Sequence, residues 1–250
     1  MPHLLTHGIQ NIVETQPQLY EFLEAVVPQE IPRATVMFDT QSRDEFKADV
    51  AGGLRLSSMS LRITINWEDP ANCPIFRQFI PLKSLMIRDS PWLNLDSLHE
   101  RNDSPVEGLV HRYPDKALFL AIPVCPTLCL YCTRSYGVGA NTELVLKEPF
   151  KLTRKRIEAV FEYIASQEDI KDIVVSGGDA YCIPPHSRWI SDSILEEIGD
   201  RLINLKNIER FRFATKGLAI APNRLLDYND PWTDALIQVS DKARKAGKRG

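Results

Sequence analysis

The sequence predicts an α/β protein, specifically an incomplete parallel (β/α) barrel that follows a helical and irregular N-terminal region. Apolar runs typical of buried strands alternate three times with segments of helical periodicity, which is the pattern of parallel βαβ units. Three strands are too few to close a barrel. The first hundred residues lack this alternation and are rich in proline and acidic residues. We therefore expect two regions, residues 1–104 and residues 105–250.

Two short helices are expected in the N-terminal region. Apolar residues recur at helical spacing over residues 18–27, which predicts an amphipathic helix there. A second helix is predicted to begin at Ser42, with Glu45 completing a capping box, and to end at Gly52–Gly53. Residues 67–104 show little periodicity, and we expect a long ordered connection that packs against a functional part of the molecule.

Three strands are expected in the second region. Residues 117–124 (ALFLAIPV) form a continuous apolar run, which is typical of a strand buried on both faces. A second run over residues 172–176 (DIVVS) ends in Gly177–Gly178, and residues 209–215 alternate as a half-exposed strand does. The outer edge of the last strand is expected to be uncovered, which favours association into a homo-oligomer.

A helix is predicted after each strand. The first lies near Thr153 and carries apolar residues at helical spacing. The second begins at Ser193, with Glu196 completing a capping box. The third begins with Asp230 as its cap and Pro231 at its first position.

Composition narrows the class of protein. The chain has 250 residues, of which 44% are hydrophobic, and a formal net charge of −3. It is too apolar for a disordered chain and too evenly charged to bind nucleic acid through net charge. No run approaches the roughly 18 apolar residues of a membrane helix, and the first ten residues do not resemble a secretory signal. We expect a protein of the cytoplasm or an organelle matrix, without nucleic acid or membrane as a partner.

Three of the five cysteines lie in one short motif. Cys125, Cys129 and Cys132 form a C-x₃-C-x₂-C spacing directly after the first predicted strand of the second region. Their odd total number and their crowding argue against a disulfide framework. Thiolates with this spacing can hold one iron–sulfur cluster, and three ligands for four irons leave one iron open to a substrate or cofactor.

Two alternatives to a cluster remain. A structural zinc site needs a fourth ligand, which His111, His186 or Cys182 would supply. Three simply buried cysteines are the other alternative, although a loop after a strand is not a core position. Cys73 and Cys182 stand apart in the sequence and are expected to be ordinary buried thiols.

The cysteine motif, with Tyr131 before its third cysteine, resembles the signature of the radical S-adenosylmethionine (SAM) enzymes. Several separated segments resemble lysine 2,3-aminomutase and its relatives: 67–70 (WEDP), 76–81 (FRQFIP), 104–110 (SPVEGLV), 111–115 (HRYPD), 132–134 (CTR) and 175–179 (VSGGD). The resemblance extends from about Trp67 to the C-terminus. It implies that the predicted strands form part of a barrel of the radical SAM type.

The resemblance implies a [4Fe–4S] cluster and SAM as cofactors. The cluster is assigned to Cys125, Cys129 and Cys132, with SAM on its open iron and Tyr131 against the adenine. The amino group of SAM is assigned to the segment Ser176, Gly177, Gly178 and Asp179. Physical reasoning supports this last assignment, because a glycine backbone at the carboxyl end of a strand lets a ligand approach closely.

Pyridoxal 5′-phosphate (PLP) is the third cofactor that the resemblance implies. Arg112 and Tyr113 resemble positions near the PLP, and Arg134 resembles the arginine that pairs with the substrate carboxylate, a task suited to a guanidinium group. Lys116 stands where relatives often carry arginine, which preserves the charge but not the bidentate geometry.

The implied function is that of an amino-acid 2,3-aminomutase of the type that converts L-lysine to β-lysine, with an electron donor as partner. The family barrel has six strand–helix units, and the lysine that binds PLP belongs to the half not recognised here. We therefore expect a fragment or truncated chain that forms no β-lysine by itself. The alternatives are a homologue that binds the cluster without mutase activity and a zinc-stabilised module that is not an enzyme.

Overall fold

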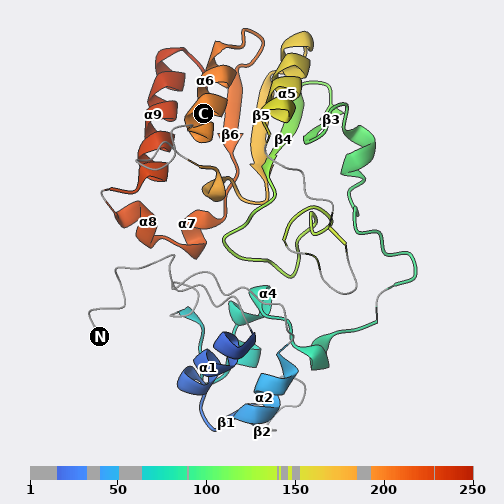
Figure 1. Ribbon diagram of the computed structural model, residues 1–250, viewed down its shortest axis with the longest axis vertical. Helices are drawn as coiled ribbons and strands as arrows, with labels where there is room; N and C mark the ends of the chain where they lie inside the picture. The colour runs from blue at the N-terminus through green and yellow to red at the C-terminus, as the bar shows by residue number, and fades with distance from the viewer. Residues whose placement is uncertain are drawn as a thin grey trace. The chain divides into compact units, whose positions relative to one another are not determined.

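The computed structural model describes residues 16–32, 40–50, 64–88, 90–139, 141, 146–147, 153–184, 193–227 and 229–249 (Figure 1). The chain divides into two units. Unit 1 consists of residues 1–93 together with residues 126–132, and unit 2 consists of residues 94–125 and 133–250. The expected boundary between residues 104 and 105 stays a prediction.

Unit 1 contains short elements: α1 (Gln16–Val26), β1 (Glu30–Pro32), β2 (Thr40–Ser42), α2 (Arg43–Asp49) and α4 (Phe76–Phe79), with 3-10 turns at Pro70–Asn72 and Lys83–Leu85. The predicted helix over 18–27 is confirmed as α1, and the capping box of Ser42 and Glu45 is present at the start of α2. The expected end of α2 at Gly52–Gly53 is wrong, because Val50 leaves the helix to pair with Leu82; the two glycines lie outside the described residues.

The antiparallel pair β1–β2 was not expected. Strands of three residues are too short to show alternation, so no sequence pattern marked them. Aromatic rings contribute to the core of unit 1: the rings of Phe46 and Phe76 lie 5.6 Å apart, and Trp67 packs edge-on against Phe76. Phe46 and Phe76 are fully buried, so α2 and α4 are held together by this contact.

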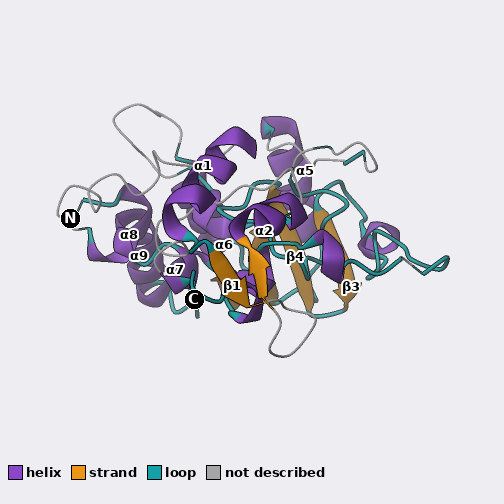
Figure 2. Ribbon diagram, turned by 90° about the horizontal axis from the view of Figure 1, so that it is seen from below, coloured by secondary structure: helices purple, strands orange, loops and turns teal. Residues whose placement is uncertain are grey.

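Unit 2 is built on a four-stranded sheet in the order β3 (Leu109–Tyr113), β4 (Lys116–Ile122), β5 (Asp172–Gly177) and β6 (Arg210–Phe213). The three predicted strands are confirmed as β4, β5 and β6, which are parallel to one another. Figure 2 shows the strands in orange, with β3 beside β4. The expectation of a purely parallel sheet is wrong, because β3 pairs with β4 in antiparallel fashion. The sheet is therefore mixed, and the fold class is α/β.

Three long helices pack on this sheet: α5 (Arg154–Ser166), α6 (Ile194–Asn204) and α9 (Pro231–Lys245). Each begins as predicted, because the side chains of Thr153, Ser193 and Asp230 accept hydrogen bonds from the third backbone N–H that follows. Shorter turns lie at Glu100–Asp103, Ala180–Cys182, α7 (Gly217–Ile220) and α8 (Asn223–Leu226).

The outer edge of β6 is partly covered, which corrects the expectation of an open edge. Arg249 forms a parallel bridge with Arg210. The Arg249 N–H donates to the carbonyl of Glu209 at 2.9 Å, and the Phe211 N–H donates to the carbonyl of Arg249 at 3.0 Å. Next to this bridge, Phe213, Leu236 and Ile237 line an apolar groove between β6 and α9.

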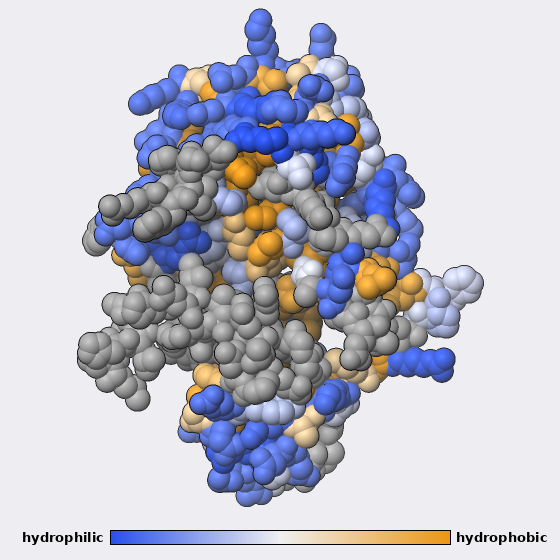
Figure 3. All heavy atoms as spheres, in the orientation of Figure 1, coloured by the Kyte–Doolittle hydropathy of each residue, from blue (hydrophilic) through white to orange (hydrophobic). Residues whose placement is uncertain are grey.

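Among the described residues visible in Figure 3, many side chains are hydrophilic, and apolar side chains gather between them in smaller patches. Among the large apolar side chains of the described residues, Ile87 and Trp92 are the most exposed, at 90% and 92%. None of the helices in the described ranges combines the length and apolar character that a membrane crossing requires.

Candidate functional site

The three motif cysteines follow the carboxyl end of β4, where parallel sheets commonly bind cofactors. We call residues 125–132 the cysteine loop. All five cysteines of the chain are outside disulfide bonds, and the three in the cysteine loop are half-buried. The Cys132 N–H donates to the carbonyl of Cys129 at 3.2 Å, so the last two cysteines belong to one tight turn.

The cysteine loop is shared between the units, because Cys125 belongs to unit 2 and residues 126–132 belong to unit 1. Among the described residues, no three His, Cys, Asp or Glu side chains form a group that could hold a metal ion. The convergence of the three thiols thus stays a prediction. Their chemistry suits an iron–sulfur cluster, because three half-buried thiols without disulfides follow one another within a single short loop.

The zinc alternative finds little support in its candidate ligands. The Nδ1 atom of His111 forms a hydrogen bond with the hydroxyl of Tyr163 at 2.9 Å, so this ring nitrogen already has a partner. Burial raises the pKa of the Cys182 thiol to about 12, which disfavours the thiolate that zinc requires. His186 lies outside the described residues.

The glycines at the end of β5 pack against the end of β4. A Cβ atom on Gly177 would lie 2.4 Å from the carbonyl oxygen of Ile122, and one on Gly178 would lie 2.3 Å from that of Val124. Gly178 donates a backbone hydrogen bond to Ile122, and the Asp179 N–H donates to Val124 at 2.9 Å. The missing side chains of these glycines therefore make room for the neighbouring strand, and the expected close approach of a ligand stays a prediction.

The residues assigned to SAM lie together at this strand end. Ser176 is buried on β5, and the residue Asp179 is 6% exposed. Both oxygens of that carboxylate are used internally: Oδ1 accepts from the Tyr181 N–H at 2.8 Å, and Oδ2 accepts from the Lys216 N–H at 2.9 Å. Asp179 thus ties the ends of β5 and β6 together, and its contact with SAM stays a prediction.

Helix α5 fixes the end of β4 through a buried arginine. The β4–β5 register shifts between Leu120 and Ile122. There, Arg156 donates to the carbonyls of Leu120 at 2.7 Å and Ala121 at 2.8 Å. Burial lowers the pKa of this guanidinium. The strand that leads into the cysteine loop is therefore held from β5 and from α5.

Arg134, which follows the cysteine loop, is held by a buried carboxylate. Its Nε and Nη2 atoms donate to Glu100 at 3.1 and 2.8 Å, and the Tyr136 hydroxyl donates to the same carboxylate at 3.0 Å. Burial, together with the Glu100 charge, raises the pKa of Tyr136. The Arg134 side chain stays 23% exposed, so Glu100 orients the guanidinium without covering it.

Glu100→Gln is expected to lower the free energy of unfolding by about 2 kcal/mol. The two oxygens of Glu100 each accept a hydrogen bond from Arg134, whereas a glutamine amide has one oxygen and would place its NH₂ group against one of these donors. Urea unfolding followed by circular dichroism measures the change. Glu158→Gln is the matched control, because Glu158 also makes a bidentate contact with an arginine, Arg201, but at the surface, where it should contribute little. Equal stability of the Glu100→Gln and unmodified chains would refute the assigned role of Glu100.

The two residues assigned to the PLP vicinity lie at the other end of the sheet. Arg112 and Tyr113 precede the tight turn into β4, and Tyr113 pairs with Lys116, the first residue of β4. The length of β4 separates them from its carboxyl end by about 20 Å. Arg112 donates to Asp103 at 2.6 Å, and this bond raises the pKa of its guanidinium. The structure does not bring these residues together with the SAM segment, and their role stays a prediction.

Two residues near the candidate site were not found from the sequence. Glu100 lies in the irregular segment, where no periodic pattern distinguishes a buried carboxylate from a surface one. Gln78 lies within the segment 76–81 that carries part of the resemblance, but nothing in its spacing indicated a contact with the cysteine loop. It accepts hydrogen bonds from the Leu130 N–H and the Tyr131 hydroxyl.

No protein-family model matches the chain. Known proteins are nevertheless similar to it. An L-lysine 2,3-aminomutase of Bacillus subtilis is 34% identical over 187 residues, which cover 72% of this chain and 36% of that protein. An L-lysine 2,3-aminomutase of Acetoanaerobium sticklandii is 30% identical over 249 residues, which cover 96% of this chain and 53% of that protein. A glutamate 2,3-aminomutase of Clostridioides difficile is 26% identical over 134 residues, which cover 54% of this chain and 28% of that protein.

The fold and the site define an α/β protein in which a cysteine loop follows a parallel strand at its carboxyl end. The similarity identifies the family: the chain belongs to the lysine 2,3-aminomutases. It spans about a third to a half of the length of the curated relatives it matches.

Proposed function

We propose that the chain is part of a radical SAM amino-acid 2,3-aminomutase, an isomerase that uses a [4Fe–4S] cluster, SAM and PLP. The observation that carries the proposal is the position of Cys125, Cys129 and Cys132, which follow β4 without disulfides. The similarity to L-lysine 2,3-aminomutases supports L-lysine as the substrate. When bound, the cluster and SAM supply the radical that starts the rearrangement, and PLP carries the migrating amino group.

In this proposal, the residues of the chain bind the cofactors and orient the substrate. The three thiolates ligate the cluster, and the segment Ser176–Asp179 lies at the neighbouring strand end to receive the amino group of SAM. Arg134 pairs with the substrate carboxylate through the part of its guanidinium that Glu100 leaves exposed. Glu100 acts as a positioning residue for Arg134. An electron donor is the partner that would reduce the cluster when it is bound.

Anaerobic reconstitution with iron and sulfide tests the cofactor assignment. We expect a brown protein with close to four irons per chain, which releases methionine from SAM when dithionite is added. A colourless protein that binds one equivalent of zinc and leaves SAM intact would refute the proposal. Adding PLP and L-lysine then tests the reaction itself, with β-lysine measured by mass spectrometry and L-glutamate as the competing substrate.

A second candidate function is a protein that binds the cluster and SAM but has no aminomutase activity. The position of Arg112 and Tyr113 at the amino end of β4 favours it, because a PLP group there would be about 20 Å from the cysteine end. Methionine release combined with no change in PLP absorbance on mixing would support this second function. β-Lysine formation would exclude it.

A further inference from the structure

The middle of the cysteine loop is attached to α4 through Gln78. The N–H of Leu130 donates to the backbone carbonyl of Gln78 at 2.9 Å, and the hydroxyl of Tyr131 donates to the side-chain oxygen Oε1 of Gln78 at 3.3 Å. The amide nitrogen Nε2 of Gln78 donates to the carbonyl of Pro74 at 3.1 Å. Because that nitrogen has an acceptor of its own, the amide is oriented with its oxygen toward Tyr131.

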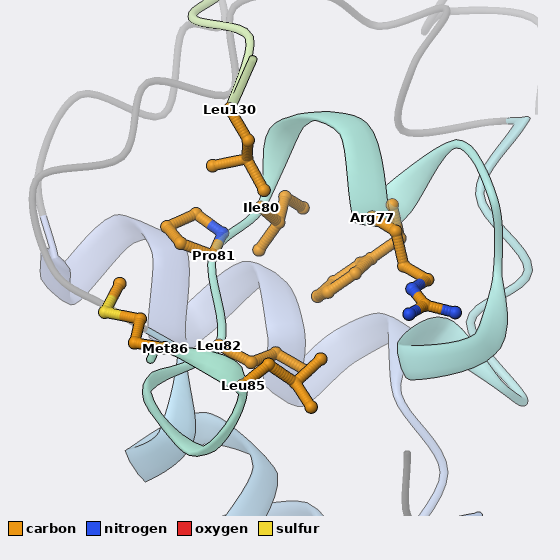
Figure 4. A pocket seen from close by; sticks show the side chains of 8 residues that line it. Arg77, Ile80, Pro81, Leu82, Leu85, Met86 and Leu130 are labelled. Carbon is orange, nitrogen blue, oxygen red and sulfur yellow. The ribbon is translucent and has the colours of Figure 1, made fainter. Parts of the chain in front are cut away.

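An apolar cavity of about 330 Å³ adds a third contact. Figure 4 shows the Leu130 side chain pointing toward Ile80 and Pro81, which line this cavity, whereas Arg77 points away from Leu130. Helix α4, which ends one residue before Ile80, is itself firmly seated, because Phe76 is fully buried against Phe46. Helix α4 is therefore a rigid support for the residues of the loop that contact it.

We propose that Gln78 is a positioning residue for the cysteine loop. Leu130 and Tyr131 are the two residues between Cys129 and Cys132, so fixing both of them fixes the backbone from which these two thiols project. The loop has no helix or strand of its own, and its internal bond from Cys132 to Cys129 spans only one turn. The inference deepens the proposed function and rests on it only for the cofactor that the loop would hold.

Hydrogen–deuterium exchange on the metal-free chain tests the attachment independently of any cofactor. Gln78→Ala removes the acceptor of the Tyr131 hydroxyl, and amide exchange in residues 126–132 is expected to rise about two- to tenfold, which corresponds to one net hydrogen bond. Gln78→Glu retains an acceptor oxygen for Tyr131 but loses the donor to Pro74, so its exchange should rise less than that of Gln78→Ala. Arg77→Ala is the matched control on the same helix and should change nothing.

Tyr131→Phe provides an independent check, because it removes the same hydrogen bond from the other partner. It should raise exchange in residues 126–132 by the same factor. Unchanged exchange in both Gln78→Ala and Tyr131→Phe would overturn the inference. An equal rise in α2 would also overturn it, because Gln78 would then support the whole of unit 1. Gln78→Glu exchanging as fast as Gln78→Ala would exclude the Oε1 atom as the anchor.

A spectroscopic measurement on the reconstituted chain separates positioning from general stability. Gln78→Ala retains all three cysteines, so its iron content should equal that of the unmodified chain. The SAM concentration that half-saturates the change in the paramagnetic resonance spectrum of the reduced cluster should rise about two- to tenfold. An unchanged half-saturation point would overturn the positioning role. If the unmodified chain takes up no cluster, the proposed function fails, and the exchange experiment alone decides the role of Gln78.

Discussion

Cys129→Ala is expected to reduce the iron content of the reconstituted chain to background and to abolish its brown colour. A cluster held by three thiolates loses its attachment when one is removed, because two ligands leave a second iron exposed to solvent. Iron and sulfide analysis, together with the visible absorption spectrum, measures the loss. The expected effect is nearly complete, from close to four irons per chain to almost none.

Cys182→Ala is the informative control. Its thiol is partly buried and packs against the core of unit 2, where burial raises its pKa to about 12, so the cluster hypothesis predicts full iron uptake in this variant. A zinc site with Cys182 as its fourth ligand would instead lose zinc in this variant. Full iron uptake by Cys129→Ala would contradict the assignment of the cysteine loop.

Gly177→Ala is expected to lower the free energy of unfolding by about 2–6 kcal/mol, the sum of backbone strain and overpacking. The φ angle of Gly177 is +123°, which L residues rarely adopt. The added methyl group would lie 2.4 Å from the carbonyl oxygen of Ile122, and both atoms belong to well-packed strand ends. Urea unfolding monitored by circular dichroism measures the change.

Gly247→Ala separates strain from overlap. Gly247 also has a positive φ, of +73°, but no atom lies within 4 Å of the position of its Cβ. Its replacement should cost only about 1–2 kcal/mol, the penalty of the left-handed backbone. If the two variants lose equal stability, the close approach of β5 to β4 contributes nothing at Gly177, and the packing argument for the glycine pair is wrong.

Local patterns predicted most elements of unit 2. The apolar run over 117–124 became β4, and the run over 172–176 became β5. The caps at Ser42, Ser193 and Asp230 were also predicted correctly. Each of these signals depends on residues within one or two turns of each other, so the sequence carries them directly.

The antiparallel strand β3 was not predicted, although it lies next to β4 in the sequence. Residues 109–113 show neither clear alternation nor a continuous apolar run, and their burial changes from buried to exposed along the strand. Their structure follows from the tight turn that pairs Tyr113 with Lys116. Pairing with a partner strand, rather than any intrinsic pattern, therefore decides this element.

The features of the candidate site also fall into two groups, those that local sequence patterns predicted and those that only the tertiary structure shows. The sequence by itself determined the three cysteines, their spacing and their place directly after a strand, because chain neighbours remain neighbours in any fold. Only the tertiary structure decided that Glu100 orients Arg134, that Gln78 holds the turn between Cys129 and Cys132, and that the glycine pair packs against β4. The two polar contacts join residues 34 and 53 positions apart, and such contacts follow from packing and burial, which no local pattern encodes.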